Sequence, residues 1–358
     1  MKIVIAIDSL KGCLSSAEAG RAATEGIMSR WPEAEIVCLP VSDGGEGWLE
    51  AVRNVKCGVG NEPWETVTTM VSDPLLRPVQ ARYLLAGETA VIEIAEACGL
   101  HLLQPEERDP LRASSRGVGE LLLDAAQRGT RKLMIGLGGS AVSDNGRGMM
   151  EAVLMKSEAS CYSSPFTHRS SFHVTIATDV ENPLYGSSGA AAVFGPQKGA
   201  TPSMVQELDH RARIFAEENA RQMGFDRSGE AGAGAAGGLG YAFMQFFDAK
   251  RRSGAGLLLD LLHFDELIRD ADFIITGEGR ADRQTLLGKL PTVILRHALR
   301  AGVPCHLIAG DVQDRESLLA AGFASVCGIT PPNMPLQEAL RPEVARQNIL
   351  QTLQVIRQ

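Results

Sequence analysis

The chain has 358 residues, 44% of them hydrophobic, and a net charge of −8 from 35 basic and 43 acidic residues. At about 150 residues per domain, this length predicts roughly two domains with ample chain for a core. The acidic balance argues against binding to nucleic acid or an anionic membrane surface, and the aromatic share of 5% argues against base stacking.

The seven cysteines are scattered and include no C-x-x-C pair, which predicts small buried residues in a reducing compartment rather than a zinc site. The apolar start of the chain is cut short by Asp8, unlike a signal peptide, and no run reaches the roughly 18 apolar residues of a membrane span. We therefore expect a cytoplasmic protein, monomeric or homodimeric, whose partners are small molecules rather than nucleic acid or membrane.

The first 50 residues are expected to form two β–α units. Residues 2–7 read as a strand, and the next helix begins at a capping box made by Ser15 and Glu18. Residues 35–41 read as a second strand. An acidic loop that contains glycine follows each strand, the first beginning at Asp8 and the second containing Asp43.

The pattern changes between about residues 56 and 263. The elements expected there are hairpin strands at 79–85 and 90–94, a helix at 114–129, and strands at 132–137 and 171–178. Residues 157–170 are polar and without a clear period, which predicts a loop. The segment AGAGAAGGLG at 231–240 is either a flexible linker or a glycine-rich turn into a helix.

The β–α rhythm returns at residue 272. The elements expected there are strands at 273–276, 304–309 and 325–329 and a helix at 290–300. The strand at 273–276 is expected to break at Gly277 and Gly279. Together with the first two strands, these form a five-stranded parallel sheet, so we predict a doubly wound α/β domain built from 1–56 and 264–358, with 57–263 inserted as a second mixed α/β domain.

Acidic residues gather at the carboxyl ends of these strands, where ligands bind in open α/β sheets: Asp8, Asp43, Glu278 and Asp311. The stretch 271–289 (ADFIITGEGRADRQTLLGK) adds further carboxylates and cations within a short distance. Such a mixture suits a metal and an anion together. The alternative is a solvated loop between strand and helix.

Seven motifs follow one another along the chain. They are Asp8-Ser-Leu-Lys-Gly12, Asp43-Gly-Gly-Glu-Gly47, Gly138-Gly-Ser140 with Asp144, Asp179-Val-Glu-Asn-Pro-Leu184, Phe194-Gly-Pro-Gln-Lys-Gly-Ala200, Gly232–Gly240, and Thr276-Gly-Glu-Gly-Arg-Ala-Asp-Arg-Gln-Thr285. In type and order this set resembles the bacterial type I glycerate kinases. The resemblance implies phosphorylation of D-glycerate by ATP with Mg²⁺, in a flavodoxin-like domain with an inserted α/β domain and an active site in the cleft between them.

This sequence departs from the family's pattern at several positions. Ile7 stands where Pro is usual, and Cys13 where Ser is common. The family's GGSATNDGG reads Gly138-Gly-Ser-Ala-Val-Ser-Asp-Asn-Gly146 here, and residues 155–172 form a shorter stretch than usual. The change at 138–146 falls in a motif expected to touch ligand, so it bears on the exact substrate preference.

Phosphoryl transfer needs positioning and charge neutralisation, and the candidate residues are assigned on that basis. The metal candidates are Asp43, Glu46, Glu278 and Asp282, since Mg²⁺ takes carboxylate ligands. Asp43 has an alternative reading as a turn residue, and Glu278 as a helix cap. The phosphate cations are Lys11 and Lys198, and the cofactor-binding residues are Gly138, Gly139, Ser140, Gly195, Gln197 and Gly199. For Lys198 the alternative is an exposed surface lysine.

The substrate carboxylate is expected to be held by an arginine fork, for which Arg116 and Arg280 are the candidates. Other residues expected at the substrate are Ser114, Ser115 and Gln284. Asp179 is the candidate that accepts the substrate hydroxyl proton, with an Asx turn as its alternative, and Asp8 is a further catalytic candidate.

Three other functions remain open from the sequence. The enzyme would be a glycerate 3-kinase if the other hydroxyl were aimed at ATP. Val142, Ser143 and Asn145 leave room for a different small hydroxy acid. A non-catalytic nucleotide sensor is disfavoured because Asp8, Lys11, Glu278 and Asp282 are all present.

Overall fold

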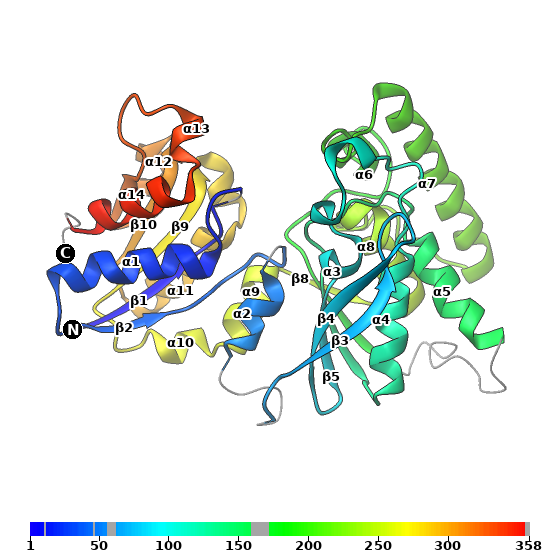
Figure 1. The fold of residues 1–358 in the computed structure, drawn as a ribbon, viewed down its shortest axis with the longest axis horizontal. Helices are drawn as coiled ribbons and strands as arrows, with labels where there is room; N and C mark the ends of the chain where they lie inside the picture. The colour runs from blue at the N-terminus through cyan, green and yellow to red at the C-terminus, as the bar shows by residue number, and fades with distance from the viewer. Residues whose placement is uncertain (11, 46, 56–61, 159–171, 355–358) are drawn as a thin grey trace. The chain divides into compact units, whose positions relative to one another are not determined.

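The computed structural model describes residues 1–10, 12–45, 47–55, 62–158 and 172–354. The chain forms two compact units (Figure 1). The first comprises Met1–Asp43, Glu50–Val55 and Ala255–Gln358, and the second comprises Gly44–Leu49 and Lys56–Gly254. Both ends of the chain therefore belong to the first unit.

The first unit is built on a five-stranded parallel sheet with strand order β11-β10-β9-β1-β2. Its elements are β1 (Lys2–Ile7), α1 (Ser16–Arg30), β2 (Glu35–Cys38), α10 (Phe264–Leu267), β9 (Phe273–Ala281), the 3-10 helix η7 (Arg283–Leu287), α11 (Leu290–Ala301), β10 (Cys305–Val312), α12 (Arg315–Ala320), β11 (Ser325–Gly328), α13 (Leu336–Ala339) and α14 (Pro342–Gln354). The predicted parallel sheet made from both chain ends is confirmed. The chain passes between the units at four points, two of which lie within the helices α2 (Trp48–Arg53) and α9 (Gly254–Leu261).

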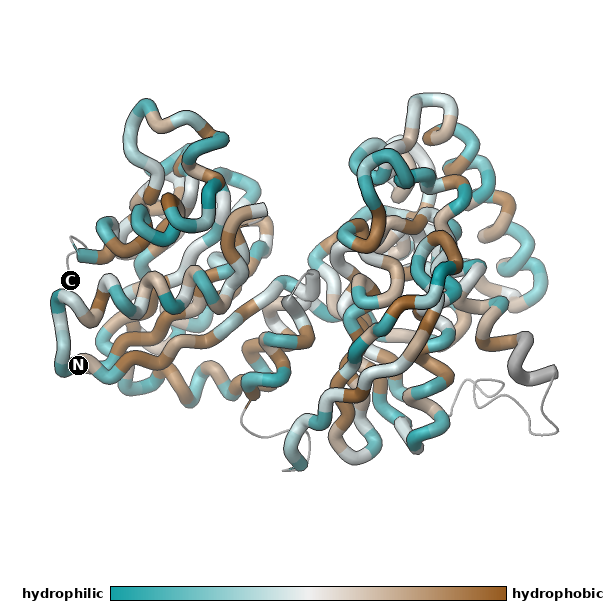
Figure 2. The backbone as a smooth tube through the Cα atoms, viewed as in Figure 1, coloured by the Kyte–Doolittle hydropathy of each residue, from teal (hydrophilic) through white to brown (hydrophobic). Residues whose placement is uncertain are grey.

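Helices α1 and α14 pack on one face of this sheet because their small and aliphatic residues share a core with alternate residues of β1 and β9. Gly26 of α1 allows the close approach, since a Cβ there would lie 2.9 Å from the carbonyl oxygen of Leu350 in α14. Hydrophobic residues concentrate along the central strands of the sheet (Figure 2). The predicted capping box of Ser15 and Glu18 is present at the start of α1.

Strand β9 corrects one expectation, because it does not break at Gly277 but continues to Ala281. The ladder with β10 continues as far as the pairs Arg280–Asp311 and Ala281–Val312. Gly277 is required inside the strand, since a Cβ there would lie 2.6 Å from the carbonyl oxygen of Ile308. The glycine therefore permits close pairing instead of ending the strand. As a result, the polar residues that follow it lie at the carboxyl end of β9.

The second unit is built on a six-stranded mixed sheet with strand order β3-β4-β5-β6-β7-β8. Its elements are β3 (Glu65–Ser72), β4 (Pro78–Ala86), β5 (Thr89–Glu93), α3 (Ala95–Cys98), η2 (Leu100–Leu102), η3 (Pro105–Glu107), α4 (Arg116–Gln127), β6 (Lys132–Gly136), α5 (Arg147–Glu158), β7 (His173–Ala177), α6 (Ala190–Phe194), η5 (Pro196–Lys198), α7 (Pro202–Met223), η6 (Ala235–Gly238), α8 (Leu239–Phe247) and β8 (Lys250–Arg252). Strands β3 to β5 pair antiparallel, as expected for the hairpin, and β5 to β8 pair parallel.

The glycine-rich segment 231–240 is the expected turn into a helix, since η6 leads directly into α8. Gly237 has a positive φ of 65°, and a Cβ there would lie 2.0 Å from the carbonyl oxygen of Val142. Of the loop predicted at 157–170, residues 157 and 158 belong to α5, and 159–170 lie outside the described residues. Along the stretches that the structure describes, no helix is both long and apolar enough to cross a membrane.

Candidate active site

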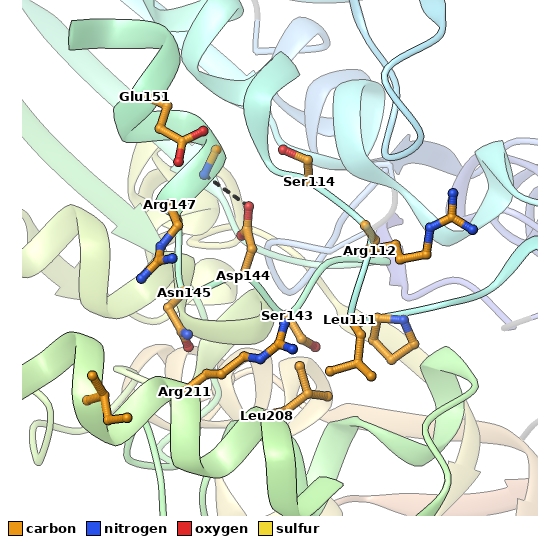
Figure 3. Close-up of a pocket in the computed structure, with 14 residues that line it drawn as sticks. Leu111, Arg112, Ser114, Ser143, Asp144, Asn145, Arg147, Glu151, Leu208 and Arg211 are labelled. Atoms are coloured by element: carbon orange, nitrogen blue, oxygen red, sulfur yellow. Dashed lines mark hydrogen bonds between the residues drawn. The ribbon is translucent and has the colours of Figure 1, made fainter. Parts of the chain in front are cut away.

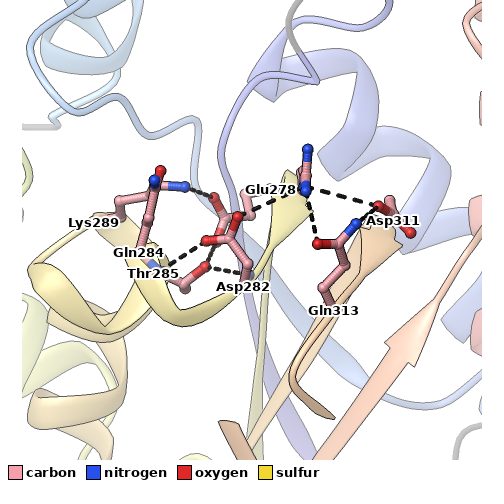
Figure 4. Close-up of polar contacts among 8 residues, drawn as sticks. Glu278, Asp282, Gln284, Thr285, Lys289, Asp311 and Gln313 are labelled. Atoms are coloured by element: carbon pink, nitrogen blue, oxygen red, sulfur yellow. Dashed lines mark hydrogen bonds and ion pairs between the residues drawn. The ribbon is translucent and has the colours of Figure 1, made fainter. Parts of the chain in front are cut away.

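The polar cluster at the end of β9 centres on Glu278, whose side chain is 9% exposed (Figure 4). The Thr285 hydroxyl donates to one carboxylate oxygen at 2.6 Å, and Lys289 Nζ donates to the other at 3.1 Å. Burial raises the pKa of Glu278 above its ordinary value, while the contacts with Thr285 and Lys289 oppose that rise. The nearby negative charge of Asp282 raises it further.

Asp282 lies at the start of η7 and caps it by accepting a hydrogen bond from the backbone N–H of Gln284 at 2.8 Å. Arg280 donates to the Gln313 side chain at 2.7 Å, and its Nε lies 3.6 Å from an Asp282 carboxylate oxygen. Arg280, expected at the substrate carboxylate, therefore already has acceptors within its own unit. The side chain of Gln284, also expected at the substrate, is exposed.

The other first-unit candidates lie at strand ends. Asp8 follows β1 directly, and its carboxylate accepts from the backbone N–H of Ser9 at 2.7 Å. Asp43 lies at the end of the segment that follows β2. Lys11 and Glu46 lie outside the described residues.

The described residues contain no group of three or more His, Cys, Asp or Glu side chains placed to hold a metal ion. Two of the predicted ligands, Glu278 and Asp282, nevertheless flank the same threonine, Thr285. One or two carboxylates suffice for Mg²⁺ when phosphate oxygens and water complete its shell. The residues present therefore fit such an ion, provided that a phosphate supplies other ligands.

In the second unit, the Asp144 carboxylate organises the turn before α5. Its Oδ2 atom accepts from the Ser115 backbone N–H and hydroxyl, both at 2.8 Å, and from the Gly148 N–H at 3.1 Å. Its Oδ1 atom accepts from the Gly146 N–H at 3.1 Å. Ser115 was predicted at the substrate, but its hydroxyl is committed to Asp144 and to the backbone N–H of Met149 at 3.0 Å.

Lys198 in η5 is buried, with 2% of the residue exposed, so the alternative of a surface lysine is wrong. Its Nζ atom donates to the Ser140 hydroxyl at 3.1 Å and to the Val142 carbonyl oxygen at 2.6 Å. Burial lowers the pKa of Lys198 to about 8, and the negative charge of Asp144 opposes the shift. The ammonium group thus holds the segment 140–142 in place.

The glycines predicted to bind cofactor lie around this lysine. Gly138 donates its N–H to the Gly44 carbonyl oxygen at 3.1 Å, and a Cβ on Gly138 would lie 2.0 Å from Gly45 Cα. Gly139 and Gly199 have positive φ values of 71° and 93°. Gly195 is buried and Gln197 is exposed, on either side of Pro196 in the same turn.

Asp179 follows β7 and is half-buried. The alternative of an Asx turn involved Asn182, whose side-chain amide donates to the Ser188 carbonyl oxygen at 2.8 Å. Arg116, the other candidate for the substrate carboxylate, donates to Glu120 at 3.0 Å. It lines a groove different from the pocket that Ser114 lines.

Ser114 instead lines a pocket of about 290 Å³ in the second unit (Figure 3). The pocket is lined by Pro110, Leu111, Arg112, Ala113, Ser114, Ser143, Asp144, Asn145, Arg147, Gly148, Glu151, Leu208, Arg211 and Ile214. Two of the positions at which the sequence departs from the family's pattern, Ser143 and Asn145, belong to this wall. The sequence did not single out Arg112, Arg147 or Arg211. Only Arg147 had a signal, as it follows the altered motif directly.

Both units are α/β folds with polar residues at the ends of parallel strands, where open sheets bind small ligands. The glycerate kinase family model matches residues 3–358. A glycerate kinase of Halalkalibacterium halodurans is 39% identical over 95% of this chain and 93% of its own length, and a glycerate 2-kinase of Escherichia coli K12 is 37% identical over the same shares. A crystal structure from Salmonella typhimurium LT2, assigned provisionally to glycerate kinase 2, superposes with a TM-score of 0.76 at 37% identity, covering 99% of this chain and 96% of that one.

The chain belongs to the glycerate kinase family. It is accordingly a kinase, and its fold agrees with that of the solved relative.

Proposed function

We propose that the protein transfers the terminal phosphoryl group of ATP to the 2-hydroxyl of D-glycerate, giving 2-phosphoglycerate, with Mg²⁺ as cofactor. The observation that carries this proposal is the similarity along 95% of the chain to a relative named glycerate 2-kinase. The polar clusters of the two units supply the groups that phosphoryl transfer requires, namely carboxylates, buried cations and a candidate base.

In the first unit, Glu278 and Asp282 would hold Mg²⁺. That ion, when bound, neutralises phosphate charge as transfer proceeds. Lys289 and Thr285 fix the Glu278 carboxylate through the bonds at 3.1 and 2.6 Å. A carboxylate that is already oriented needs no reorganisation when its partner arrives.

In the second unit, Asp179 would accept the proton of the substrate hydroxyl, because it is a half-buried carboxylate at the end of a parallel strand. Lys198 would act on the reaction by fixing the segment 140–142 rather than by direct contact, since both side-chain hydrogen bonds that it makes within the described residues go to that segment. We further propose that residues of both units act on the same substrates.

The test is incubation of the full chain with Mg²⁺-ATP and D-glycerate, followed by phosphorus NMR of the product. We expect the resonance of 2-phosphoglycerate, identified by added standard, and no turnover in the presence of EDTA. A 3-phosphoglycerate resonance would show that the enzyme phosphorylates the 3-hydroxyl instead. Turnover only with another hydroxy acid would show that D-glycerate is not the substrate. Binding of ATP without any product would make the protein a sensor.

We place this reaction in the cytoplasm as part of the proposal. The support is that five cysteines within the described residues are free thiols, as a reducing compartment requires: Cys13, Cys38, Cys98, Cys305 and Cys327.

A further inference from the structure

The pocket in the second unit is lined by arginines together with uncharged polar residues. Three arginines line it, from three separate segments: Arg112 from the loop before α4, Arg147 from the first turn of α5, and Arg211 from α7. Figure 3 shows the side chains of Arg147 and Arg211 extending toward Asn145 and Ser143. In the same view the Arg112 side chain extends away from both, so Arg147 and Arg211 are the two cations placed to bind an oxyanion.

Two of these guanidinium groups are not neutralised by any residue that the structure describes. Within the described residues, neither Arg112 nor Arg147 has a carboxylate partner, and Arg147 instead lies over the Phe215 ring at 5.3 Å. Arg211 shares its charge with Glu207 at 2.6 Å. Cations that lack internal partners at a pocket are available to a ligand.

The acidic residues of the pocket differ in how much of their hydrogen-bonding capacity remains. The Asp144 carboxylate already accepts four hydrogen bonds, two from Ser115 and two from the backbone N–H groups of Gly146 and Gly148. Glu151 is exposed and lies on the same side of the pocket as Arg147 in Figure 3. The lining has three arginines against two acids, and Glu207 outside the lining pairs with one of those arginines, Arg211.

The remaining lining indicates a ligand that carries hydroxyl groups. Ser114, Ser143 and Asn145 offer hydroxyl and amide groups, and Leu111, Leu208 and Ile214 give the pocket an apolar side. Asn145 is 7% exposed and has a positive φ of 59°, and a Cβ on Gly238 would lie 2.7 Å from its Cα. The amide is therefore held in a fixed place, as a specificity group must be.

We propose that this pocket binds the hydroxy-acid substrate, with Arg147 and Arg211 holding its carboxylate. The inference rests on the proposed function for the choice of D-glycerate. It moves the carboxylate site away from Arg116 and Arg280, which do not line this pocket.

The experiment measures binding of D-glycerate to the full chain by calorimetry, with and without a non-hydrolysable ATP analogue. Arg147→Gln and Arg211→Gln are compared with Arg221→Gln, which replaces an exposed arginine further along α7 and outside the pocket. Loss of one charge-assisted contact weakens binding by roughly 10- to 100-fold. We expect that loss in Arg147→Gln and Arg211→Gln and a change below about twofold in Arg221→Gln, with the affinity for the ATP analogue unchanged in all three.

A second variant separates charge from shape. Arg147→Lys keeps the positive charge and loses the planar fork, so we expect glycerate affinity between those of the wild type and Arg147→Gln. The pocket is overturned if Arg147→Gln and Arg211→Gln bind glycerate as the wild type does, or if they weaken the ATP analogue instead. Turnover of glycerate in that case would leave the proposed function standing. A wild type that binds glycerate through Arg147 but forms no product would overturn the proposed function and support the pocket.

Discussion

The candidate site of each unit contains a buried charged side chain, Lys198 in the second unit and Glu278 in the first, and the two are stabilised in different ways. Lys198 in the second unit donates to a serine hydroxyl and a backbone carbonyl oxygen, which are neutral acceptors. Glu278 in the first unit accepts from a threonine hydroxyl and also pairs with Lys289, a cation that is 42% exposed. Burial is the largest cause of the pKa shift in both groups: it lowers the pKa of Lys198 against the charge of Asp144, and it raises the pKa of Glu278 against the contacts with Thr285 and Lys289.

The comparison indicates that the two clusters have different duties. A cation enclosed by neutral groups of a loop fixes that loop and has little freedom to meet a ligand. A carboxylate whose partner reaches solvent can exchange that partner for another cation. The second-unit cluster is accordingly the more rigid one, and the following substitutions test that difference.

The largest effect is expected for Asp144→Ala in the second unit. The change removes the acceptor of three backbone N–H groups and one hydroxyl. Each buried donor left without a partner costs about 1 kcal/mol or more, so we expect a loss of about 3 kcal/mol of unfolding free energy. Urea unfolding at pH 7 measures it. A loss below about 1 kcal/mol would show that the turn before α5 does not depend on this carboxylate.

The next effect concerns the pH dependence that Lys198 imposes. Its folded pKa of about 8 lies below the ordinary lysine value, so the folded state binds fewer protons than the unfolded state as the pH rises from 8 toward that value. Stability from this group therefore increases with pH in that window. The unfolding free energy of the wild type relative to Lys198→Met should rise by about 2 kcal/mol between pH 7.5 and pH 10. A difference that is flat with pH would mean that the ammonium is hydrated.

A smaller effect is expected for Asp282→Ala, the first-unit counterpart of Asp144→Ala. Asp282 caps the short helix η7 by accepting from the backbone N–H of Gln284 at 2.8 Å, and it forms a capping box with Thr285. Loss of such a cap costs about 1 kcal/mol. Urea unfolding without added metal measures it, and a loss as large as that of Asp144→Ala would remove the contrast between the two clusters.

The smallest effect is expected for Glu278→Gln. Because burial raises the folded pKa of Glu278, the folded state holds its proton at pH values where the unfolded state has released it. The stability that the wild type has relative to Glu278→Gln should therefore decrease as the pH rises from 4 to 7. Thermal unfolding across that range measures the trend. An increase in this stability difference with pH would show that the folded pKa of Glu278 is lowered instead.

The sequence predicted the sheet of the first unit because its strands are continuous apolar runs, as in parallel sheets covered on both faces. It failed at the end of β9, where Gly277, Gly279 and the charged residues after them resemble a loop. Strand character there comes from the ladder with β10, whose residues lie about 30 positions away. Local composition does not report a pairing of that kind.

The sites show the same limit. Glu278, Asp282 and Arg280 were recognised as one polar group because they are neighbours in sequence. The side chain of Lys198 is buried against Ser140 and Val142, which are more than 50 positions earlier in the chain. Arg147 and Arg211 line the same pocket because of how α5 and α7 pack. Charged residues that meet only through tertiary packing have no characteristic spacing in the sequence, so sequence patterns do not predict their contact.

The pairing of β1 with β9 has a consequence for the synthesis of the chain. Ile3 pairs with Phe273, so the first strand leaves the ribosome 270 residues before its central neighbour. At about 5 to 20 residues per second, that interval is roughly 15 to 55 s. Residues 56–254 form a nearly complete unit of their own and emerge entirely within it. The inserted unit is thus free to fold first during translation, while β1 and β2 await the strand that completes their sheet.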